Sequence, residues 1–371
     1  MNWTLIEGDA ALAEALSQYA DADAVAVDTE FMRRNTYFPK VALVQLCFDE
    51  AALLIDPLTL TDPSPLIDLL TDESITKVLH SASEDLEVFD HWLGVLPAPL
   101  FDTQRAAALL DRGFGIGYRA LVEAICGVDL PKGETRSDWL QRPLTQSQCE
   151  YAAQDVTYLL PVYRELAAAC RQDDRYQWVL DDGADALAAF GTASREYFRR
   201  IKSAWALDRL QLATLEAISH WREDTARRRD KPRGWIIDDK ACFELARACP
   251  ANLEHFAEVS GLPHGAVRRF GEELLALIAE QKQRTPDELP QKLPSPLSAS
   301  QRNRLKSLKQ RARVVAEALG MAPEALLPGK EYELLIREAE GEIIRVPRHW
   351  SGWRANRVVE PLRLYLLEQG G

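Results

Sequence analysis

Strand-like runs occupy only the first half of this 371-residue chain, and this division constrains the fold more than any other feature. Between residues 24 and 58 lie three short runs rich in Val, Leu and Ala, and a fourth candidate strand, ITKVLHS, begins at Ile75. The short connections between the first three runs favour antiparallel pairing. Beyond residue 175 the periodicity is helical. We therefore expect an α/β domain, a mixed sheet with flanking helices, followed by small all-α domains.

Domain boundaries follow from length and from proline content. A chain of 371 residues exceeds what one hydrophobic core usually organises. The segment TPDELPQKLPSPLS holds four prolines and is typical of a linker between two helical sets. The expected divisions are an α/β domain at 1–170, a helical connector at 171–208, a helical domain at 209–288 and a second one at 289–371. We also expect the α/β domain to form its hydrophobic core from its own residues, so that a chain cut after about residue 205 stays folded.

Local signals within the first half predict where its helices begin and end. The spacing of Ser81 and Glu84 predicts a capping box that opens a helix. Gly113 and Gly127 each follow a helical run and are candidate C-caps. Pro161 lies inside a long helical pattern that begins near Thr145, and it should kink that helix or divide it in two.

The net charge of −13 is unevenly distributed. Residues 1–175 contain 13 basic and 29 acidic side chains, whereas residues 176–371 contain 31 basic and 28 acidic ones. The first part could hold cations, and the second could contact phosphates. No apolar run approaches 18 residues, and the six cysteines form no C-x-x-C pair. These features predict a cytoplasmic protein with reduced thiols and no membrane association.

Acidic residues at particular positions carry the strongest chemical signal. Asp28 and Glu30 are two apart on an apolar strand and so share one face. Tyr151 and Asp155 are four apart on a helix and also share a face, and Asp85 lies in the first turn of another helix. Taken singly, each acid is equally typical of a solvated surface. Four converging carboxylates, however, would repel one another unless divalent cations offset their charge, and oxygen ligands favour Mg²⁺ or Mn²⁺.

Three segments containing these residues resemble the motifs of a known superfamily. VDTEF, HSASEDLEVF and YAAQDVTYL resemble the three exonuclease motifs of the DEDD superfamily, and their order and context closely match the bacterial ribonuclease D family. The helical half is similar to the HRDC domains of that family. TLEAISHWREDTARRRDKPRGWIIDD and LPHGAVRRFGEELLALI resemble a first HRDC domain, and SGWRANRVVEPLRLYL resembles a divergent second one.

The resemblance implies a fold, an activity and roles for individual residues. It implies a ribonuclease-H-like domain that acts as a metal-dependent 3′–5′ exoribonuclease, releases nucleoside 5′-monophosphates and trims tRNA precursors and other structured RNAs. Asp28, Glu30, Asp85 and Asp155 would hold two divalent ions, Mg²⁺ or Mn²⁺. Tyr151 would position the attacking water. Glu150 stands where the histidine branch of the superfamily has its histidine, which assigns the chain to the tyrosine branch.

A basic cluster in the helical half is a candidate RNA contact. It comprises Arg227, Arg228, Arg229, Lys231 and Arg233, followed by Trp235. Cations beside an aromatic ring suit phosphates and an unpaired base, but a solvated helix end would have the same composition. Two further functions stay open: a 3′–5′ exonuclease acting on DNA, and a non-catalytic nucleic-acid-binding scaffold. A single chain with both accessory domains predicts a monomer.

Overall fold

A computed structural model describes the chain except for residues 1, 50, 132, 135–136, 192–194 and 370–371. It contains two compact units. Unit 1 comprises Met1–Met32, Pro39–Ala188 and Leu297–Gly371, and unit 2 comprises Arg33–Phe38 and Ala189–Pro296. None of the described helices is long and apolar enough to cross a membrane.

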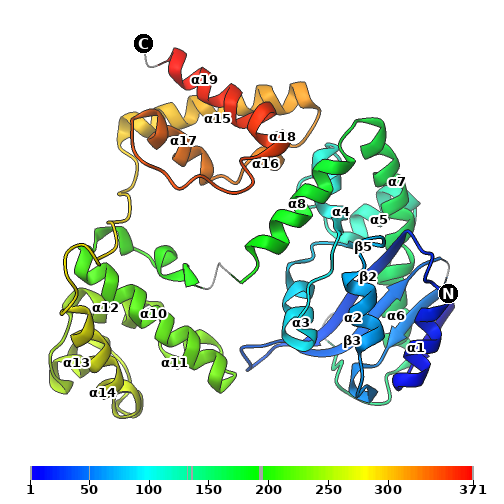
Figure 1. Cartoon of the computed structure of the whole chain (residues 1–371), viewed down its shortest axis with the longest axis horizontal. Helices are drawn as coiled ribbons and strands as arrows, with labels where there is room; N and C mark the ends of the chain where they lie inside the picture. The colour runs from blue at the N-terminus through cyan, green and yellow to red at the C-terminus, as the bar shows by residue number, and fades with distance from the viewer. Residues whose placement is uncertain (1, 50, 132, 135–136, 192–194, 370–371) are drawn as a thin grey trace. The chain divides into compact units, whose positions relative to one another are not determined.

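A six-stranded mixed sheet forms the centre of unit 1, with strand order β1-β4-β3-β2-β5-β6 (Figure 1). The neighbours β2–β3 and β3–β4 pair antiparallel, as expected, and the other neighbours pair parallel. Of the two innermost strands, β3 is buried over residues 42–47 and β2 over residues 24–27, which explains the apolar runs of these segments. The strands are β1 Asn2–Ile6, β2 Ala24–Met32, β3 Lys40–Cys47, β4 Ala51–Ile55, β5 Thr76–Leu79 and β6 Leu100–Asp102.

Helices in the first 189 residues surround this sheet. Helix α6 packs against β1, β2, β3 and β4, and α3 packs against β2 and β3. The predicted interruption near Pro161 is confirmed, because α6 ends at Thr157 and α7 begins at Leu159. The helices are α1 Asp9–Ser17, α2 Ser64–Thr71, α3 Ser83–Leu93, α4 Thr103–Leu109, α5 Tyr118–Cys126, α6 Gln146–Thr157, α7 Leu159–Gln172 and α8 Tyr176–Ala189, with a 3₁₀ turn, η1, at Pro57–Thr59.

The C-terminal helices share the hydrophobic core of unit 1. Leu308, Leu335 and Val358 belong to the same buried cluster as residues of the sheet and of α6. Trp353 stacks on Trp178 of α8, with ring centroids 4.5 Å apart. The expectation that the α/β domain owns its core is therefore wrong. These elements are α15 Ala299–Leu319, α16 Pro323–Leu326, α17 Glu331–Ala339, α18 Gly352–Arg354, a π-helical turn η4 Ala355–Val359, and α19 Glu360–Glu368.

A buried ion pair joins the same helices to α8. Arg354 of α18 and Asp182 of α8 each expose about 5% of the side chain, and the Arg354 guanidinium donates two hydrogen bonds to the Asp182 carboxylate. Arg105 of α4 donates a third at 2.8 Å. The Ala322 N–H also donates to the Ala108 carbonyl at 3.1 Å. Both apolar packing and hydrogen bonds thus bind residues 297–371 to the sheet domain.

Unit 2 is all helical in its described part and has a separate hydrophobic core. The turn between β2 and β3, residues 33–38, belongs to this unit, because the Tyr37 and Phe38 N–H groups donate to Asp230 at the C-terminal end of α10. The Pro-rich segment before α15 is non-helical, as predicted. The elements are η2 Tyr197–Arg200, η3 Ala204–Ala206, α10 Arg209–Arg229, α11 Arg233–Ile236, α12 Asp239–Ala248, α13 Leu253–Ser260 and α14 His264–Gln281.

Two of the local signals behave differently from expectation. Helix α3 is capped at Ala82 with no side-chain cap, so the capping box predicted for Ser81 and Glu84 is wrong. Gly113 caps no helix, because α4 ends at Leu109, whereas Gly127 is a left-handed C-cap as predicted.

Candidate active site

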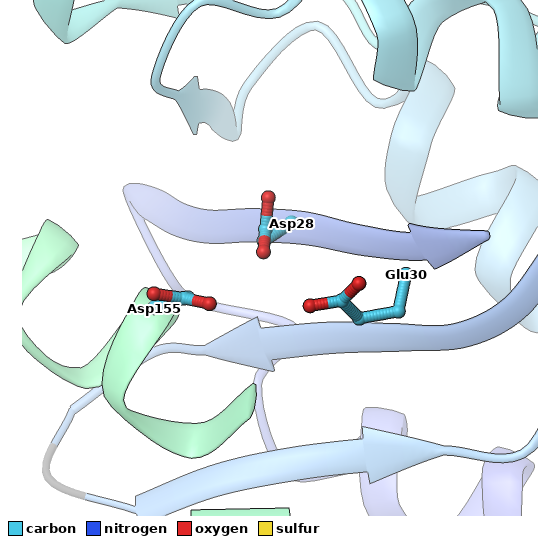
Figure 2. A group of neighbouring side chains, drawn as sticks. All are labelled: Asp28, Glu30 and Asp155. Carbon is cyan, nitrogen blue, oxygen red and sulfur yellow. The ribbon is translucent and has the colours of Figure 1, made fainter. Parts of the chain in front are cut away.

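Strand β2 brings two carboxylates to one place. Asp28 and Glu30 lie on the same face of β2, beyond the last residue that pairs with β5, which is Ala26. Figure 2 shows both carboxylates facing that of Asp155, which comes from α6. One oxygen of each lies within 4.8 Å of the others. The predicted convergence of these three residues is therefore present in the structure.

Helix α6 supplies Asp155 and Tyr151 from a single face. Thr145 and Gln148 form a capping box that fixes where α6 begins. The Tyr151 hydroxyl lies one turn before the Asp155 carboxylate on the same face of α6, close enough to lower the pKa of that carboxyl, although burial outweighs this effect. The Tyr151 ring packs beside Trp139, and a Cβ added to Gly133 would stand only 2.3 Å from its Cδ2 atom. The ring is thus held by a tryptophan on one side and by glycine backbone on another.

Asp85 approaches the same strand from α3, but it lies outside the group of three. It is buried in the first turn of α3, and its Oδ1 accepts a hydrogen bond of 2.5 Å from the Thr29 hydroxyl. The Asp102 carboxylate accepts hydrogen bonds from the Ser81 and Ala82 N–H groups, so it anchors the turn that leads into α3. Thr29 therefore holds the Asp85 carboxylate beside β2, and Asp102 holds the turn that precedes α3.

The acids strongly disfavour simultaneous ionisation. Desolvation, followed by the charges of Asp155 and Asp85, raises the pKa of Glu30 to about 9. Desolvation likewise raises the pKa of both Asp85 and Asp155 to about 7. The pKa of Asp28 lies well above its usual range, because of desolvation and then the charges of Asp85, Asp155 and Glu30. The site therefore needs a positive charge in order to be fully ionised at neutral pH.

These donors fit a divalent cation. Asp28, Glu30 and Asp155 offer hard oxygen atoms within reach of one ion. Mg²⁺ and Mn²⁺ prefer such ligands. The arrangement is that of a metal-dependent hydrolytic site rather than of a surface acid patch.

Comparisons with known proteins agree with this geometry. A family model described as 3′-5′ exonuclease matches residues 4–170, and one described as HRDC domain matches residues 211–278. The chain is 42% identical, over 96% of its length and 96% of the relative's, to ribonuclease D of Pseudomonas paraeruginosa. It is 36% identical to ribonuclease D of Escherichia coli over 99% of both chains. The chain belongs to the ribonuclease D family. It is accordingly a hydrolytic 3′–5′ exoribonuclease.

A solved structure extends the similarity to the whole chain. The crystal structure of Escherichia coli RNase D, described as an exoribonuclease involved in structured RNA processing, matches with a TM-score of 0.90 and 37% identity. The match covers 100% of this chain and 99% of that one. The expected mixed-sheet exonuclease domain with a helical HRDC-containing remainder is confirmed.

The basic cluster of unit 2 divides into members that pair with a carboxylate and members that do not. The Arg227 and Arg233 guanidinium groups donate to the carboxylate of Glu223, a buried residue that also accepts from the Tyr37 hydroxyl. Arg228 and Arg229 are exposed: Arg228 donates a hydrogen bond to the Thr225 hydroxyl, Arg229 lies over the Phe270 ring, and the described residues offer neither of them a carboxylate within ion-pair distance. The Lys231 Nζ donates to the Asn35 carbonyl at 3.4 Å, and Trp235 is 64% exposed. Arg227 and Arg233 therefore have a structural partner, while Arg228, Arg229 and Trp235 face solvent.

Sequence reasoning missed several residues that shape the site. Thr29 holds the Asp85 carboxylate, Asp102 holds the turn that precedes α3, and Gly133 packs against Tyr151. Gln45 lies directly across from Asp28 on β3. A signal for Gln45 was present, since it is the one polar residue in the apolar run VALVQLC. The roles of Thr29, Asp102 and Gly133 arise from tertiary contacts, which no local sequence pattern indicates.

Proposed function

We propose that this exoribonuclease trims the 3′ ends of structured RNAs, tRNA precursors among them, and releases nucleoside 5′-monophosphates with the help of two divalent cations. The single observation that carries the proposal is the convergence of Asp28, Glu30 and Asp155 with Tyr151 beside them. The RNA class is supported by the structured-RNA role described for the Escherichia coli relative.

The four acids would share the binding of the cations. Asp28, Glu30 and Asp155 would contact them directly, and Asp85, held by Thr29, would act at longer range. Bound cations would supply the positive charge that promotes ionisation of the attacking water and stabilises the departing 3′-oxygen. The same charge would let the four acids ionise together despite their raised pKa values.

Tyr151 would orient the attacking water without acting as a base. Desolvation and the neighbouring Asp155 raise the pKa of its hydroxyl above the ordinary value, so it stays protonated at neutral pH. A protonated phenol donates one hydrogen bond and accepts others, which allows it to hold a water between itself and Glu30. The packing of Trp139 and Gly133 around the ring restricts where that hydroxyl can lie.

The remaining assignments concern the parts outside the site. We propose the sequence domains 1–170, 171–208, 209–288 and 289–371, of which the last packs on the first within one compact unit, together with a monomeric state and a cytoplasmic location. The basic cluster of unit 2, with Arg228, Arg229 and Trp235 as its exposed members, would contact RNA. The surplus of acidic residues in 1–175 makes this part a poor holder of a polyanion, so phosphate contacts would come from the helical half.

The test is a 3′-extended tRNA precursor incubated with the protein in Mg²⁺ and in EDTA, with products read at nucleotide resolution. The expected result is stepwise shortening from the 3′ end in Mg²⁺ alone, with 5′-monophosphates as the released product. A DNA strand of the same sequence serves as the comparison substrate. Equal shortening of the DNA, or shortening that persists in EDTA, would contradict the proposal.

A further inference from the structure

Gln45 lies in a row of side chains that also contains Asp28. In the antiparallel pair β2–β3, Asp28 stands directly opposite Gln45, and in the pair β3–β4, Gln45 stands opposite Leu54. Directly opposed residues of antiparallel strands project from the same face, with Cβ atoms about 4.5–5.5 Å apart. Gln45 therefore projects from the sheet face that carries Asp28 and Glu30, the face on which α6 packs.

The carboxamide of Gln45 is buried without a partner. The side chain is 0% exposed, and among the described residues neither its Nε2 nor its Oε1 has a hydrogen-bond partner. Buried polar groups are nearly always hydrogen-bonded, because an unmade bond in the interior costs the full desolvation of the group. A glutamine in the middle of a buried apolar strand thus calls for a particular explanation.

The neighbours of Gln45 in its row leave one candidate for that bond. Leu54, on one side, is apolar and fully buried, so it can neither donate nor accept. Asp28, on the other side, carries a carboxyl group that can accept a hydrogen bond, and one of its oxygens lies within 4.8 Å of oxygens of Glu30 and Asp155. A carboxylate that binds a cation is commonly held in turn by a hydrogen bond from an outer residue, which fixes the oxygen that faces the metal.

We propose that Gln45 is a positioning residue for the carboxylate site: its amide N–H group donates to the ionised Asp28 carboxylate, directly or through one water, and so sets the orientation of that carboxylate toward bound cations. The inference rests on the proposed metal-dependent function. The carboxamide of Gln45 has no partner among the described residues, so this bond would satisfy a buried polar group and would couple the amide to metal affinity.

The test compares two properties of Gln45→Met, a substitution that keeps length and volume and removes both polar atoms. In EDTA the variant should melt at a temperature equal to or higher than that of the unsubstituted chain, because an unsatisfied buried group has been removed. The Mn²⁺ dissociation constant, measured by titration calorimetry, should rise about 10–100-fold, the usual effect of removing an outer-shell partner. Leu54→Met is the matched control: it alters packing in the same row without removing a polar atom, and it should leave Mn²⁺ affinity unchanged.

A second variant covers the possibility that Gln45→Met fails to fold. Gln45→Asn keeps the carboxamide but withdraws it by one methylene, so it should bind Mn²⁺ more weakly than the unsubstituted chain. Unchanged Mn²⁺ affinity in either folded variant would overturn the inference and make Gln45 a core residue only. Failure of the proposed function would look different, since the unsubstituted chain would then shorten RNA without a divalent cation.

Discussion

At the residue scale, Asp28 combines a central expected catalytic role with an electrostatic cost of ionisation. Its carboxyl is desolvated and repelled by Asp85, Asp155 and Glu30. Asp28→Asn should reduce RNA trimming to below a tenth of normal, because an amide cannot supply the charge that a divalent cation needs. The same variant should melt at a higher temperature in EDTA, because the repulsion has been removed. Trimming assays paired with thermal melts check both, and a melting temperature that falls would show that Asp28 is stabilising without metal.

The raised pKa values of the acids predict how the metal-free chain responds to pH. Glu30, at about 9, and Asp85 and Asp155, at about 7, hold protons in the folded chain that they release near pH 4 when unfolded. Their contribution to stability is therefore fully present below about pH 4 and is lost as pH rises through 7 and 9. Mg²⁺, which we expect to bind the ionised acids, should restore that stability, and more so at high pH.

Thermal melts at pH 5.5, 7.0 and 8.5, in EDTA and in Mg²⁺, measure this effect. The melting temperature in EDTA should fall across the series, and the gain from Mg²⁺ should be largest at pH 8.5. Asp28→Asn is the control, because one repelling charge is absent and its pH dependence should be flatter. A melting temperature in EDTA that is independent of pH would contradict the shifted pKa values.

The sequence predicts which of these residues share a site only when they lie close together in the chain, within one strand or one helix. Asp28 and Glu30 share a face because strand side chains alternate, and Tyr151 and Asp155 because a helix repeats every 3.6 residues, so both pairs are visible in the sequence. The bond from Thr29 to Asp85 joins residues 56 positions apart, and the row formed by Asp28 and Gln45 depends on strand register. Such contacts exist only once the sheet has formed.

At the element scale, the loop before α6 controls the position of Tyr151. A methyl group on Gly133 would stand 2.3 Å from Cδ2 and 2.8 Å from Cε2 of that ring, so the ring must move. Gly133→Ala should therefore slow hydrolysis about as much as Tyr151→Phe, on the order of 10²-fold if orienting the water is the role of the hydroxyl. Mn²⁺ affinity should stay near normal in both variants. Gly117→Ala is the control, because an added Cβ there meets no atom within 4 Å. Normal turnover in Gly133→Ala would mean that the loop backbone moves to make room for the methyl group while the Tyr151 ring keeps its position.

Element boundaries were predictable where a strong local signal was present. Pro161 divides α6 from α7, because proline has no N–H group to donate to a helical hydrogen bond. Gly127 ends α5, because glycine readily adopts the left-handed conformation of a C-cap. The strand β6 has only three residues, too few to show the alternation of apolar and polar side chains that predicts a strand. Helix α3 begins at a turn held by Asp102, a distant residue, and so the local capping pattern around Ser81 misled.

At the scale of the whole molecule, the ion pair of Asp182 links the C-terminal helices to the sheet domain. Burial would raise the pKa of this carboxyl, but the hydrogen bonds and charges of Arg354 and Arg105 outweigh burial and lower it. Asp182→Asn should destabilise unit 1 by about 3–5 kcal/mol, because it leaves a buried guanidinium without its counter-charge. Urea unfolding measures the loss of stability.

The control is Asp185→Asn on the same helix. Asp185 pairs with Arg348, which is 73% exposed, so this ion pair should contribute less than about 1 kcal/mol. An equal loss of unfolding free energy in the two variants would show that the buried ion pair stabilises unit 1 no more than the exposed one does.

The sequence could not predict this association. The helical periodicity of residues 299–368 shows that each helix has an apolar face, but not which surface covers it. Trp353 and Arg354 look like features of a separate helical domain until α8 places Trp178 and Asp182 against them. The assignment of residues to a compact unit is thus a tertiary property, and the sequence alone supports only the division into helical and mixed parts.

The distribution of charge over the whole chain leads to the last prediction, which concerns RNA affinity. Arg228 and Arg229 are exposed cations outside the Glu223 cluster, whereas Arg227 and Arg233 are bonded to Glu223 within unit 2. Arg228→Ala combined with Arg229→Ala should weaken binding of a tRNA-sized substrate and flatten the dependence of log K on log salt by up to roughly 0.7–0.9 per lost phosphate contact. Its melting temperature should stay normal. Arg227→Ala combined with Arg233→Ala should instead lower the melting temperature, because the buried carboxylate of Glu223 is left without a counter-charge.

Measuring RNA binding at two salt concentrations, together with thermal melts of both variants, distinguishes arginines that contact RNA from arginines that stabilise unit 2. An unchanged salt slope in the Arg228 and Arg229 variant would make this helix end a solvated surface and direct the search for the RNA path elsewhere.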